Sequence, residues 1–487
     1  MPVQWPVTPR PGQAETAEQL ATLIEQGHRV LFSAPTGWGK THCVIAALVE
    51  AKTLPAVWLV RSLALGPRVA EDAALWGLVS FVAAGREKMC PLAPRLGSAV
   101  HDFCRFAKFK CRYAKLARIS ATDWRELRER AQREGFCPYY AQDLVYSDVF
   151  VQNYNRPLRR WVKALIVDEA HNIALPEERI VKISQLAEAV ASARMHVSAR
   201  ALKALENLIR YTLVKDGSLD VFLDEETKGE ILRHYHELLV ENPERARELH
   251  PLVTLLNAVA AYVEGERVSI FKPPRVPLFR PAILVTATPL LPLPVSIDAE
   301  VRVPWERKIP AFIVSDVSSK FEEFDTRMVL KYKRLLFAVA KRARRVLVFA
   351  ASERIAKELR AWANYEETQP PKDWEGVALL RARGRFAEGV DIEAESVIVA
   401  GAPFLPPEIS DRLARHYRTQ GYEEPVRLAI DAPMLSTLLQ CIGRAWRDPK
   451  KDPPTVYLAD WRFARYKELL QEWMDIKREC SIEELER

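Results

Sequence analysis

Continuous apolar runs separated by helical patterns mark the first part of the chain. Residues 29–33 (RVLFS), 56–60 (AVWLV) and 164–170 (ALIVDEA) have the character of buried strands, and residues 282–289 (AILVTATP) form a fourth run of this kind. The sequence THCVIAALVEAK over 41–52 predicts a helix. Apolar strands without polar alternation, separated by helices, predict a parallel sheet that is covered on both faces.

The stretch between the third and fourth runs has a different pattern. Residues 185–214 and 245–264 space their apolar side chains as amphipathic helices do, and we expect almost no strand there. Residues 173–277 are therefore predicted to be a helical insertion. The proline-rich residues 272–281 (KPPRVPLFRP) would form its stiff return to the sheet.

The C-terminal part of the chain predicts a second lobe. Apolar runs at 345–352, 396–404 and 455–460 again have the character of buried strands. The expected fold class is α/β, with two lobes on parallel sheets and insertions in the first lobe. The predicted division places the first lobe at 1–88, 139–172 and 278–304, a cysteine-containing insertion at 89–138, the helical insertion at 173–277, and the second lobe at 305–487.

Composition and charge narrow the class of protein. With 48% hydrophobic and 28% charged residues among 487, the chain is expected to be globular and not disordered. No apolar run is long enough to cross a bilayer and the N-terminus lacks a signal-peptide pattern, so we expect a cytoplasmic or nuclear protein.

Positive charge is concentrated in one segment. Residues 86–134 hold 13 Lys or Arg and 6 Asp or Glu, a surplus equal to the net charge of +7 of the whole chain. A solvated basic face is one explanation. A surface that faces phosphates is the other, because cations near a polyanion gain free energy from counterion release.

A phosphate-binding loop is predicted by the residues APTGWGKT, which end at Thr41 and lie between a predicted strand and a predicted helix. Backbone N–H groups of such a loop, with the helix N-terminus, form an anion site. Thr36 lies in this loop, and Gly37 and Gly39 let the backbone approach the phosphates. Lys40 would supply charge to the β- and γ-phosphates, and the Thr41 hydroxyl would ligate Mg²⁺.

Two carboxylates end the third apolar run, in the sequence Asp-Glu-Ala-His. Asp168 would hold Mg²⁺, and Glu169 would orient an attacking water molecule. An ordinary acidic turn is the alternative, but a phosphate-binding loop in the same chain favours a catalytic pair.

A helical stretch near the C-terminus, QCIGRAWR, carries a third group of candidate catalytic residues. Arg444 and Arg447 are three residues apart and share a helix face, and Gln440 precedes them by one turn. Two guanidinium groups on one face can hold a γ-phosphate as charge develops during transfer.

Four of the seven cysteines fall in the basic segment: Cys90, Cys104, Cys111 and Cys137. Their spacing contains no C-x-x-C pair, which is unlike common zinc fingers. Four thiolates can hold a [4Fe–4S] cluster or a zinc ion, and ligand softness does not choose between them. Buried or disulfide-bonded cysteines are the remaining alternative.

Together these motifs resemble the XPD-like iron–sulfur DNA helicases of superfamily 2, in family order along nearly the whole chain. The resemblance rests on Arg10-Pro-Gly-Gln13, APTGWGKT, VRSLALGPRV at 60–69, AAGREKMC at 83–90, FCPYY at 136–140, VFVQNYN at 149–155, the DEAH sequence, Thr286-Ala-Thr288-Pro, GRFAEGVDI at 384–392 and QCIGRAWR. Trp38 departs from the family, which commonly has a small residue there.

The resemblance implies more than the residues do. It implies two RecA-like motor lobes, a 4Fe–4S cluster on the four cysteines, and an Arch-like helical domain. It assigns Arg10 and Gln13 to adenine recognition and adds Gly389 and Asp391 to the nucleotide site. The cofactors implied are ATP, Mg²⁺ and the cluster.

The function implied is 5′→3′ translocation of a monomer on single-stranded DNA, with fork or tailed duplex DNA as partner and DNA repair as setting. Two alternatives remain. One is a DinG-like translocase that remodels nucleoprotein or R-loop structures. The other is a nucleic-acid-binding subunit in which ATP acts only as a switch.

Overall fold

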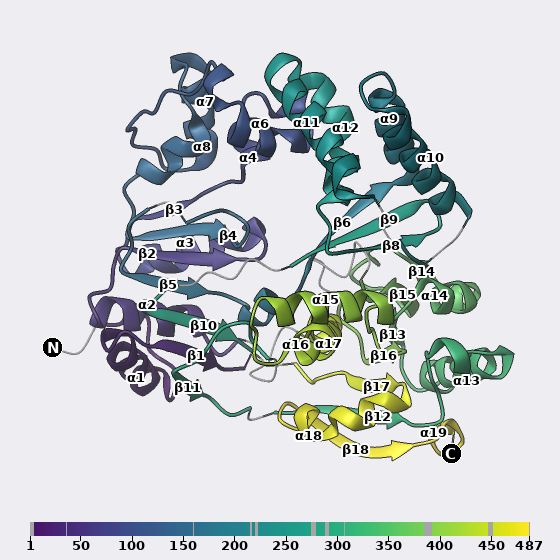
Figure 1. The fold of residues 1–487 in the computed structure, drawn as a ribbon. Coiled ribbons are helices and arrows are strands. Elements are labelled where there is room, and N and C mark those ends of the chain that lie inside the picture. The colour runs from purple at the N-terminus through teal and green to yellow at the C-terminus, as the bar shows by residue number, and fades with distance from the viewer. Residues whose placement is uncertain are drawn as a thin grey trace.

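The structure is a computed structural model of the 487-residue chain. It describes residues 4–35, 37–158, 160–214, 217–219, 223–273, 279–287, 292–305, 307–383, 392–446 and 451–486. Figure 1 shows two α/β lobes, with the N-terminus on the first and the C-terminus on the second, and further helical units above them.

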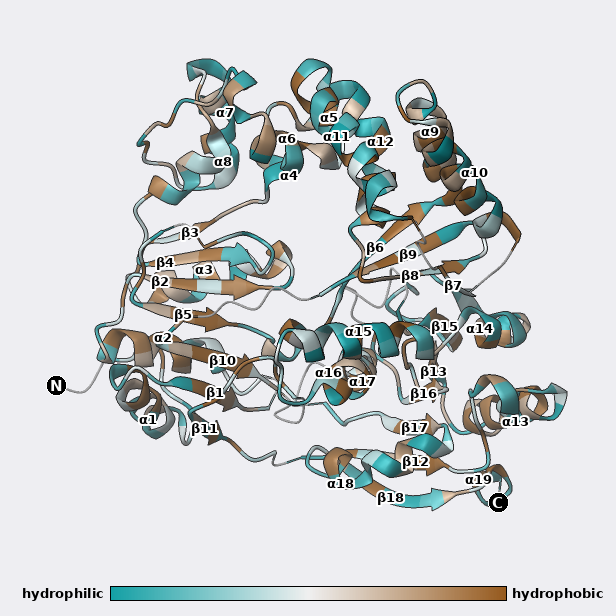
Figure 2. Cartoon of the chain, viewed as in Figure 1, coloured by the Kyte–Doolittle hydropathy of each residue, from teal (hydrophilic) through white to brown (hydrophobic). Residues whose placement is uncertain are grey.

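The first lobe is built on a seven-stranded parallel sheet in the order β11-β1-β10-β5-β2-β4-β3. Its central strands are mostly brown in Figure 2, as expected for strands that are buried on both faces. The elements of this lobe are α1 Gln13–Glu25, β1 Arg29–Ser33, α2 Lys40–Glu50, β2 Ala56–Val60, α3 Gly66–Leu75, β3 Ser80–Val82, β4 Val149–Asn153, β5 Ala164–Val167, β10 Ala282–Thr286 and β11 Ala299–Arg302. The four predicted strands are confirmed as β1, β2, β5 and β10.

The second lobe repeats this architecture. Its seven strands are all parallel, in the order β14-β15-β13-β16-β17-β12-β18. Its elements are β12 Ile309–Val314, α13 Thr326–Ala340, β13 Arg345–Ala350, α14 Glu353–Leu359, β14 Tyr365–Glu366, β15 Gly376–Arg381, β16 Ser396–Ala400, α15 Pro407–Thr419, α16 Pro425–Ala429, α17 Asp431–Ala445, β17 Thr455–Ala459, α18 Lys467–Leu470, β18 Met474–Cys480 and α19 Ile482–Glu486. The predicted α/β class with two parallel-sheet lobes is confirmed.

Between β3 and β4 the chain forms a compact unit of short helices, which contains the cysteines. Its helices are α4 Arg86–Met89, α5 Ala93–Leu96, α6 Val100–Phe106, α7 Trp124–Glu134 and α8 Pro138–Ala141. Leu127 and Phe136 of this unit pack with Leu31 and Phe150 of the first sheet. We call residues 89–138 the cysteine segment.

The stretch between β5 and β10, which we call the insert (residues 173–277), corrects the expectation of an almost strand-free unit. It holds four helices and also an antiparallel sheet in the order β6-β9-β8-β7. Its elements are β6 Glu177–Lys182, α9 Ile183–Ala193, α10 Ala199–Val214, β7 Gly217–Ser218, α11 Glu225–Glu241, α12 Pro243–Leu256, β8 Ala260–Glu264 and β9 Arg267–Lys272. Among the described residues, no helix is long and apolar enough to cross a membrane.

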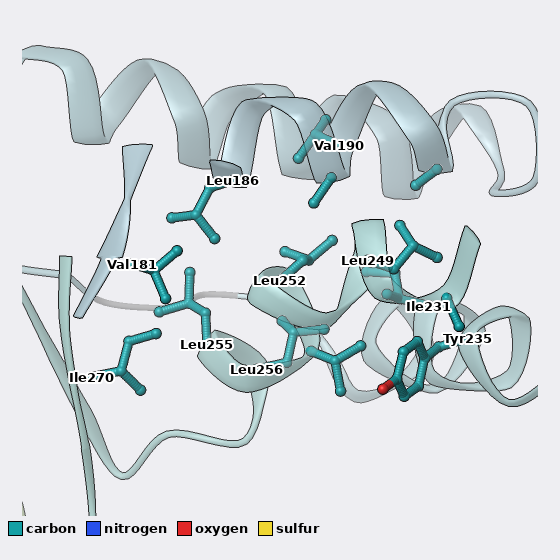
Figure 3. Packing of buried hydrophobic residues seen from close by; sticks show 14 of the residues in the cluster. Val181, Leu186, Val190, Ile231, Tyr235, Leu249, Leu252, Leu255, Leu256 and Ile270 are labelled. Carbon is teal, nitrogen blue, oxygen red and sulfur yellow. The ribbon is translucent and has the colours of Figure 1, made fainter. Parts of the chain in front are cut away.

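The insert and the cysteine segment share one hydrophobic core. Figure 3 shows Leu186 and Val190 of α9 above Leu249 and Leu252 of α12. The same core includes residues of the cysteine segment: Ala93, Leu96, Val100, Phe103 and Ala107. Because buried apolar surface is the main source of folding free energy, the two units stabilise each other.

The insert also touches the second lobe. Ala260 of β8 and Phe271 of β9 belong to a core with Ile409, Leu413 and Tyr417 of α15. The insert therefore lies between two strands of the first lobe in the sequence but packs on the second lobe in space. Figure 1 shows this for β8 and α15.

Candidate functional site

The loop between β1 and α2 has the geometry of an anion site. Gly37 and Gly39 have φ values of 78° and 95°, in the left-handed region that favours glycine. A Cβ on Gly39 would collide with the Gln13 amide. Gly39 is the N-cap of α2, so Lys40 and Thr41 lie in the first helical turn, where backbone N–H groups attract anions.

The Lys40 ammonium group is held inside this loop. Its Nζ donates to the carbonyl oxygens of Ala34 at 2.8 Å and Pro35 at 3.0 Å. Burial lowers the pKa of Lys40 to about 8, against the opposing effect of the Asp168 and Glu169 charges. The ammonium group thus lies near both carboxylates.

Arg10 and Gln13 contact the backbone of the same loop. The Arg10 guanidinium donates to the Gly37 carbonyl oxygen, and Gln13 Nε2 donates to the Trp38 carbonyl oxygen at 2.7 Å. Gln13 Oε1 in turn accepts from the Arg10 backbone N–H at 2.7 Å. The Trp38 ring packs edge-on against Phe32, with 6.0 Å between the centroids. Both predicted adenine-recognition residues therefore lie against the phosphate loop.

Asp168 lies at the carboxyl end of β5, where ligands bind in parallel α/β sheets. Trp58 Nε1 donates to Asp168 Oδ2 at 3.3 Å, and the Glu169 backbone N–H donates to Oδ1 at 2.9 Å. Burial, followed by the neighbouring Glu169 charge, raises the pKa of Asp168 to about 6. Such a carboxyl group gains from a cation that replaces its lost hydration.

Glu169 occupies a strained turn. Its φ of 47° is in the left-handed region, which is uncommon for a residue other than glycine and is typical of functional sites. The Tyr154 hydroxyl donates to the carbonyl oxygens of Asp168 and Glu169 and so supports this backbone conformation. Asn172 Nδ2 donates to Glu169 Oε2 at 3.3 Å.

His171 links the acidic turn to the end of β10. Its Nδ1 lies 3.3 Å from the Thr286 hydroxyl. Burial, with Arg61 and Lys40 nearby, lowers the pKa of His171 to about 3, so the ring is neutral near pH 7. A neutral ring can exchange a hydrogen bond with Thr286 without adding charge to the site.

The second lobe reaches the site through α17, which packs on the 3-10 turn η5 (Ala170–Ala174). Gln440 Nε2 of α17 donates to Asn172 Oδ1 at 2.9 Å. Arg444 lies four residues further along α17, on the same helix face as Gln440, and its side chain is half-buried. Lys40 and Asp168 of the first lobe and Gln440 of the second therefore lie around the same acidic turn, which contains Glu169.

Some predicted site residues lie outside the described residues, and nothing is concluded about their positions: Thr36, Thr288, Gly389, Asp391 and Arg447.

The four cysteines of the cysteine segment converge on one pocket. Cys90, Cys104, Cys111 and Cys137 all line it, with Phe103, Tyr113 and Tyr139. Burial, together with the other three thiols and against a hydrogen bond from the Leu92 backbone, raises the pKa of the Cys90 thiol to about 11. All seven cysteines are free, which removes the disulfide alternative.

The thiols share the pocket without adopting a ligand geometry. No group of three or more His, Cys, Asp or Glu side chains in the described part of the chain is arranged to hold a metal ion. The donor set nevertheless fits a thiolate-bound centre, because four cysteines line one pocket together with aromatic residues. The chemistry of the residues favours such a group.

Asn172, Arg61 and Tyr154 are residues of the site that sequence patterns did not single out. Arg61 Nη1 donates to Asn172 Oδ1 at 2.6 Å. Tyr154 and Arg61 were visible only as members of the longer stretches that resemble the helicase family. Asn172 follows directly after the DEAH residues, and that adjacency was the one signal available for it.

Comparison with known proteins gives one family match and a set of similar folds. Residues 326–476 match the family of helicase C-terminal domains. No curated protein sequence matches the chain. A solved XPD helicase structure has a TM-score of 0.67 at 18% identity, covering 97% of this chain and 100% of its own.

Two further structures are similar. An apo XPD structure has a TM-score of 0.61 at 17% identity, covering 95% of this chain and 99% of its own. Xpd4 of S. tokodaii has a TM-score of 0.61 at 18% identity, covering 97% of this chain and 100% of its own. Identities this low establish the fold. The chain therefore has the fold of XPD helicase structures, and residues 326–476 of its second lobe match a helicase C-terminal domain.

Proposed function

We propose that the chain is an ATP-dependent DNA helicase that moves 5′→3′ on single-stranded DNA and acts in DNA repair. The observation that carries the proposal is the 2.9 Å contact between Gln440 and Asn172. This contact joins the second lobe to the acidic turn beside Lys40. A nucleotide site shared by two lobes changes shape when the nucleotide binds or leaves, and such hinge closure can move a strand.

The first lobe supplies the phosphate and magnesium ligands. Lys40 would exchange its two carbonyl partners for the β- and γ-phosphate oxygens of ATP. Asp168 and Thr41 would hold Mg²⁺, which neutralises charge on the phosphates when bound. Glu169, exposed and set in its strained turn, would orient the attacking water molecule.

The second lobe would complete the site on closure. Arg444 and Arg447 would stabilise the charge that develops on the γ-phosphate. Arg10 and Gln13 would recognise adenine, as the family resemblance suggests, and their contacts with the Gly37 and Trp38 carbonyl groups would tie that recognition to the loop. Gly389 and Asp391 remain proposed members of the nucleotide site.

The cysteine segment offers a surface suited to nucleic acid. Phe109 is 73% exposed, and cationic side chains surround it in the sequence. Cations pair with phosphates, and an exposed ring can stack on a base. The exposed cations of this stretch are Arg105, Lys108, Lys110, Arg112, Lys115 and Arg118. Residues 60–69, which include Arg61, are a second proposed contact with the strand.

The four thiols would hold a 4Fe–4S cluster. Cys90, Cys104, Cys111 and Cys137 surround one pocket, and the cluster would cross-link the short helices that contain them. The basic stretch from Arg105 to Arg118 includes Cys111, so ordering of the cluster site would also order the surface proposed to bind nucleic acid. Polarity, the repair role and the preference for fork or tailed duplexes rest on resemblance to XPD-like helicases.

ATP turnover with and without single-stranded DNA tests this proposal. We expect the wild-type chain to hydrolyse ATP faster with the strand present, and Lys40→Ala to lower turnover by at least about 100-fold, because it removes the ammonium group proposed to bind the phosphates. Lys203→Ala, on the exposed face of α10, is the matched control and should retain wild-type turnover. Near-normal turnover of Lys40→Ala would contradict the assignment of the phosphate loop.

A further inference from the structure

One buried amide connects three parts of the candidate site. Asn172 is only 6% exposed. Its Oδ1 accepts from Arg61 Nη1 at 2.6 Å and from Gln440 Nε2 at 2.9 Å, while its Nδ2 donates to Glu169 Oε2 at 3.3 Å. A guanidinium group can only donate and a carboxylate can only accept, so these partners fix which way the amide points.

The three partners come from separate elements. Arg61 directly follows β2, and its carbonyl oxygen accepts from the Asn153 amide of β4. The Asn172 backbone N–H donates to the Glu169 carbonyl oxygen at 2.9 Å. Arg61, Glu169 and Asn172 are therefore anchored in the first lobe, whereas Gln440 arrives with the second.

We infer that Asn172 is a positioning residue that aligns the Glu169 carboxylate only when the second lobe and the stretch 60–69 are in place. When Gln440 withdraws, the Asn172 oxygen loses one of two donors, and the amide is less firmly held. Glu169 then loses the orientation that its bond to Nδ2 provides. The inference rests on the proposed function, because it assumes that Glu169 orients water for ATP hydrolysis.

A purely structural role for Asn172 is the competing explanation. It predicts loss of folded protein, or a uniform loss of ligand binding, after substitution. A positioning role predicts a loss confined to turnover, since the described hydrogen bonds of the Asn172 side chain join it to Arg61, Gln440 and Glu169. The two explanations therefore predict different changes in kcat and KM. They also predict different effects when substitutions at Asn172 and Gln440 are combined.

The experiment compares Asn172→Ala, Asn172→Asp, Gln440→Ala and the double variant Asn172→Ala/Gln440→Ala. With saturating single-stranded DNA, we expect Asn172→Ala to lower kcat by about tenfold or more, the size of a lost hydrogen bond to a charged group. KM for ATP should change by less than about twofold. The double variant should be no slower than Asn172→Ala alone, because the two side chains act as one unit.

A control variant, together with Asn172→Asp, keeps the result interpretable. Asn257→Ala is the matched control, because the Asn257 amide donates to the nearby Val253 carbonyl oxygen, at 2.9 Å within the insert, and its turnover should equal that of the wild type. If Asn172→Ala does not fold, Asn172→Asp distinguishes the positioning role from the purely structural one. It preserves size and acceptors but cannot donate to Glu169, and it should show the same loss of kcat.

Losses that multiply in the double variant, a rise in KM that matches the fall in kcat, or unchanged kcat in Asn172→Asp would each overturn the inference. These outcomes leave the proposed function standing if the wild-type chain is still stimulated by the strand. A wild-type chain without strand-stimulated turnover would instead overturn the proposed function, and the inference with it.

Discussion

Lys40 and Asp168 are two residues of the candidate site whose pKa values burial moves toward neutrality. Burial lowers the pKa of Lys40 to about 8 and raises the pKa of Asp168 to about 6. Burial disfavours the charged form of each group, so the shifts have opposite signs. Near neutral pH both groups are largely charged, but each approaches its titration range within about one pH unit.

A bell-shaped pH profile follows for ATP turnover. We expect kcat/KM to rise with pH through about 6, as Asp168 loses its proton and can hold Mg²⁺, and to fall above about 8, as Lys40 loses its charge. Because kcat/KM reports the free enzyme, the relevant pKa values are those of the site without nucleotide. Steady-state rates at low ATP and constant ionic strength measure the profile. A flat profile from about pH 5 to 9 would contradict it.

At the scale of single residues, the sequence indicated those whose chemistry depends on near neighbours in the chain. Gly37, Gly39 and Lys40 stand together because a loop between a strand and a helix places them there. The role of Asn172 was not predictable in this way. Its partners Arg61 and Gln440 are 111 and 268 residues away, and only the packing of two lobes brings them together.

Among the secondary-structure elements, α11 and α12 of the insert are tied to α6 of the cysteine segment by a buried polar cluster. The Tyr235 hydroxyl donates to Asp102 Oδ2 at 2.8 Å and lies 3.0 Å from His250 Nδ1. Tyr235 is completely buried in the shared core, as Figure 3 shows for its ring. Loss of the hydroxyl would leave two polar groups without this partner.

Tyr235→Phe should therefore destabilise the joint between the insert and the cysteine segment. We expect the free energy of unfolding to fall by about 1–3 kcal/mol, the usual cost of removing one partner of a buried hydrogen bond. Thermal or denaturant unfolding measures it. Tyr211→Phe is the matched control, because its hydroxyl is exposed and its 3.5 Å contact with the Ser218 carbonyl oxygen is long. Equal stability of the Tyr235→Phe variant and wild type would exclude a stabilising role for the cluster.

Helices and central strands followed from local patterns, but the sheet of the insert did not. Residues 245–264 show one continuous apolar periodicity, yet α12 ends at Leu256 and β8 begins at Ala260. The hairpin to β9 turns at Gly265, which has a φ of 56°. Its glycine was the local signal for a turn, whereas the pairing with β6 depends on residues far away in the chain.

At the scale of the whole molecule, the two α/β lobes could be predicted, because each lobe repeats the pattern of apolar strands. The contacts of the insert could not. Its helices share a core with the cysteine segment, and its strands β8 and β9 pack on α15 of the second lobe. These contacts depend on complementary surfaces that no single stretch of sequence displays.

Strand separation is the most direct test of the central claim. Protein purified without oxygen, given ATP and Mg²⁺, should unwind a duplex with a 5′ single-stranded tail and leave the matching 3′-tailed duplex intact. Cys90→Ser, which removes one sulfur from the shared pocket, should abolish unwinding of the 5′-tailed duplex. Wild-type protein that separates neither duplex, or only the 3′-tailed one, would contradict the account.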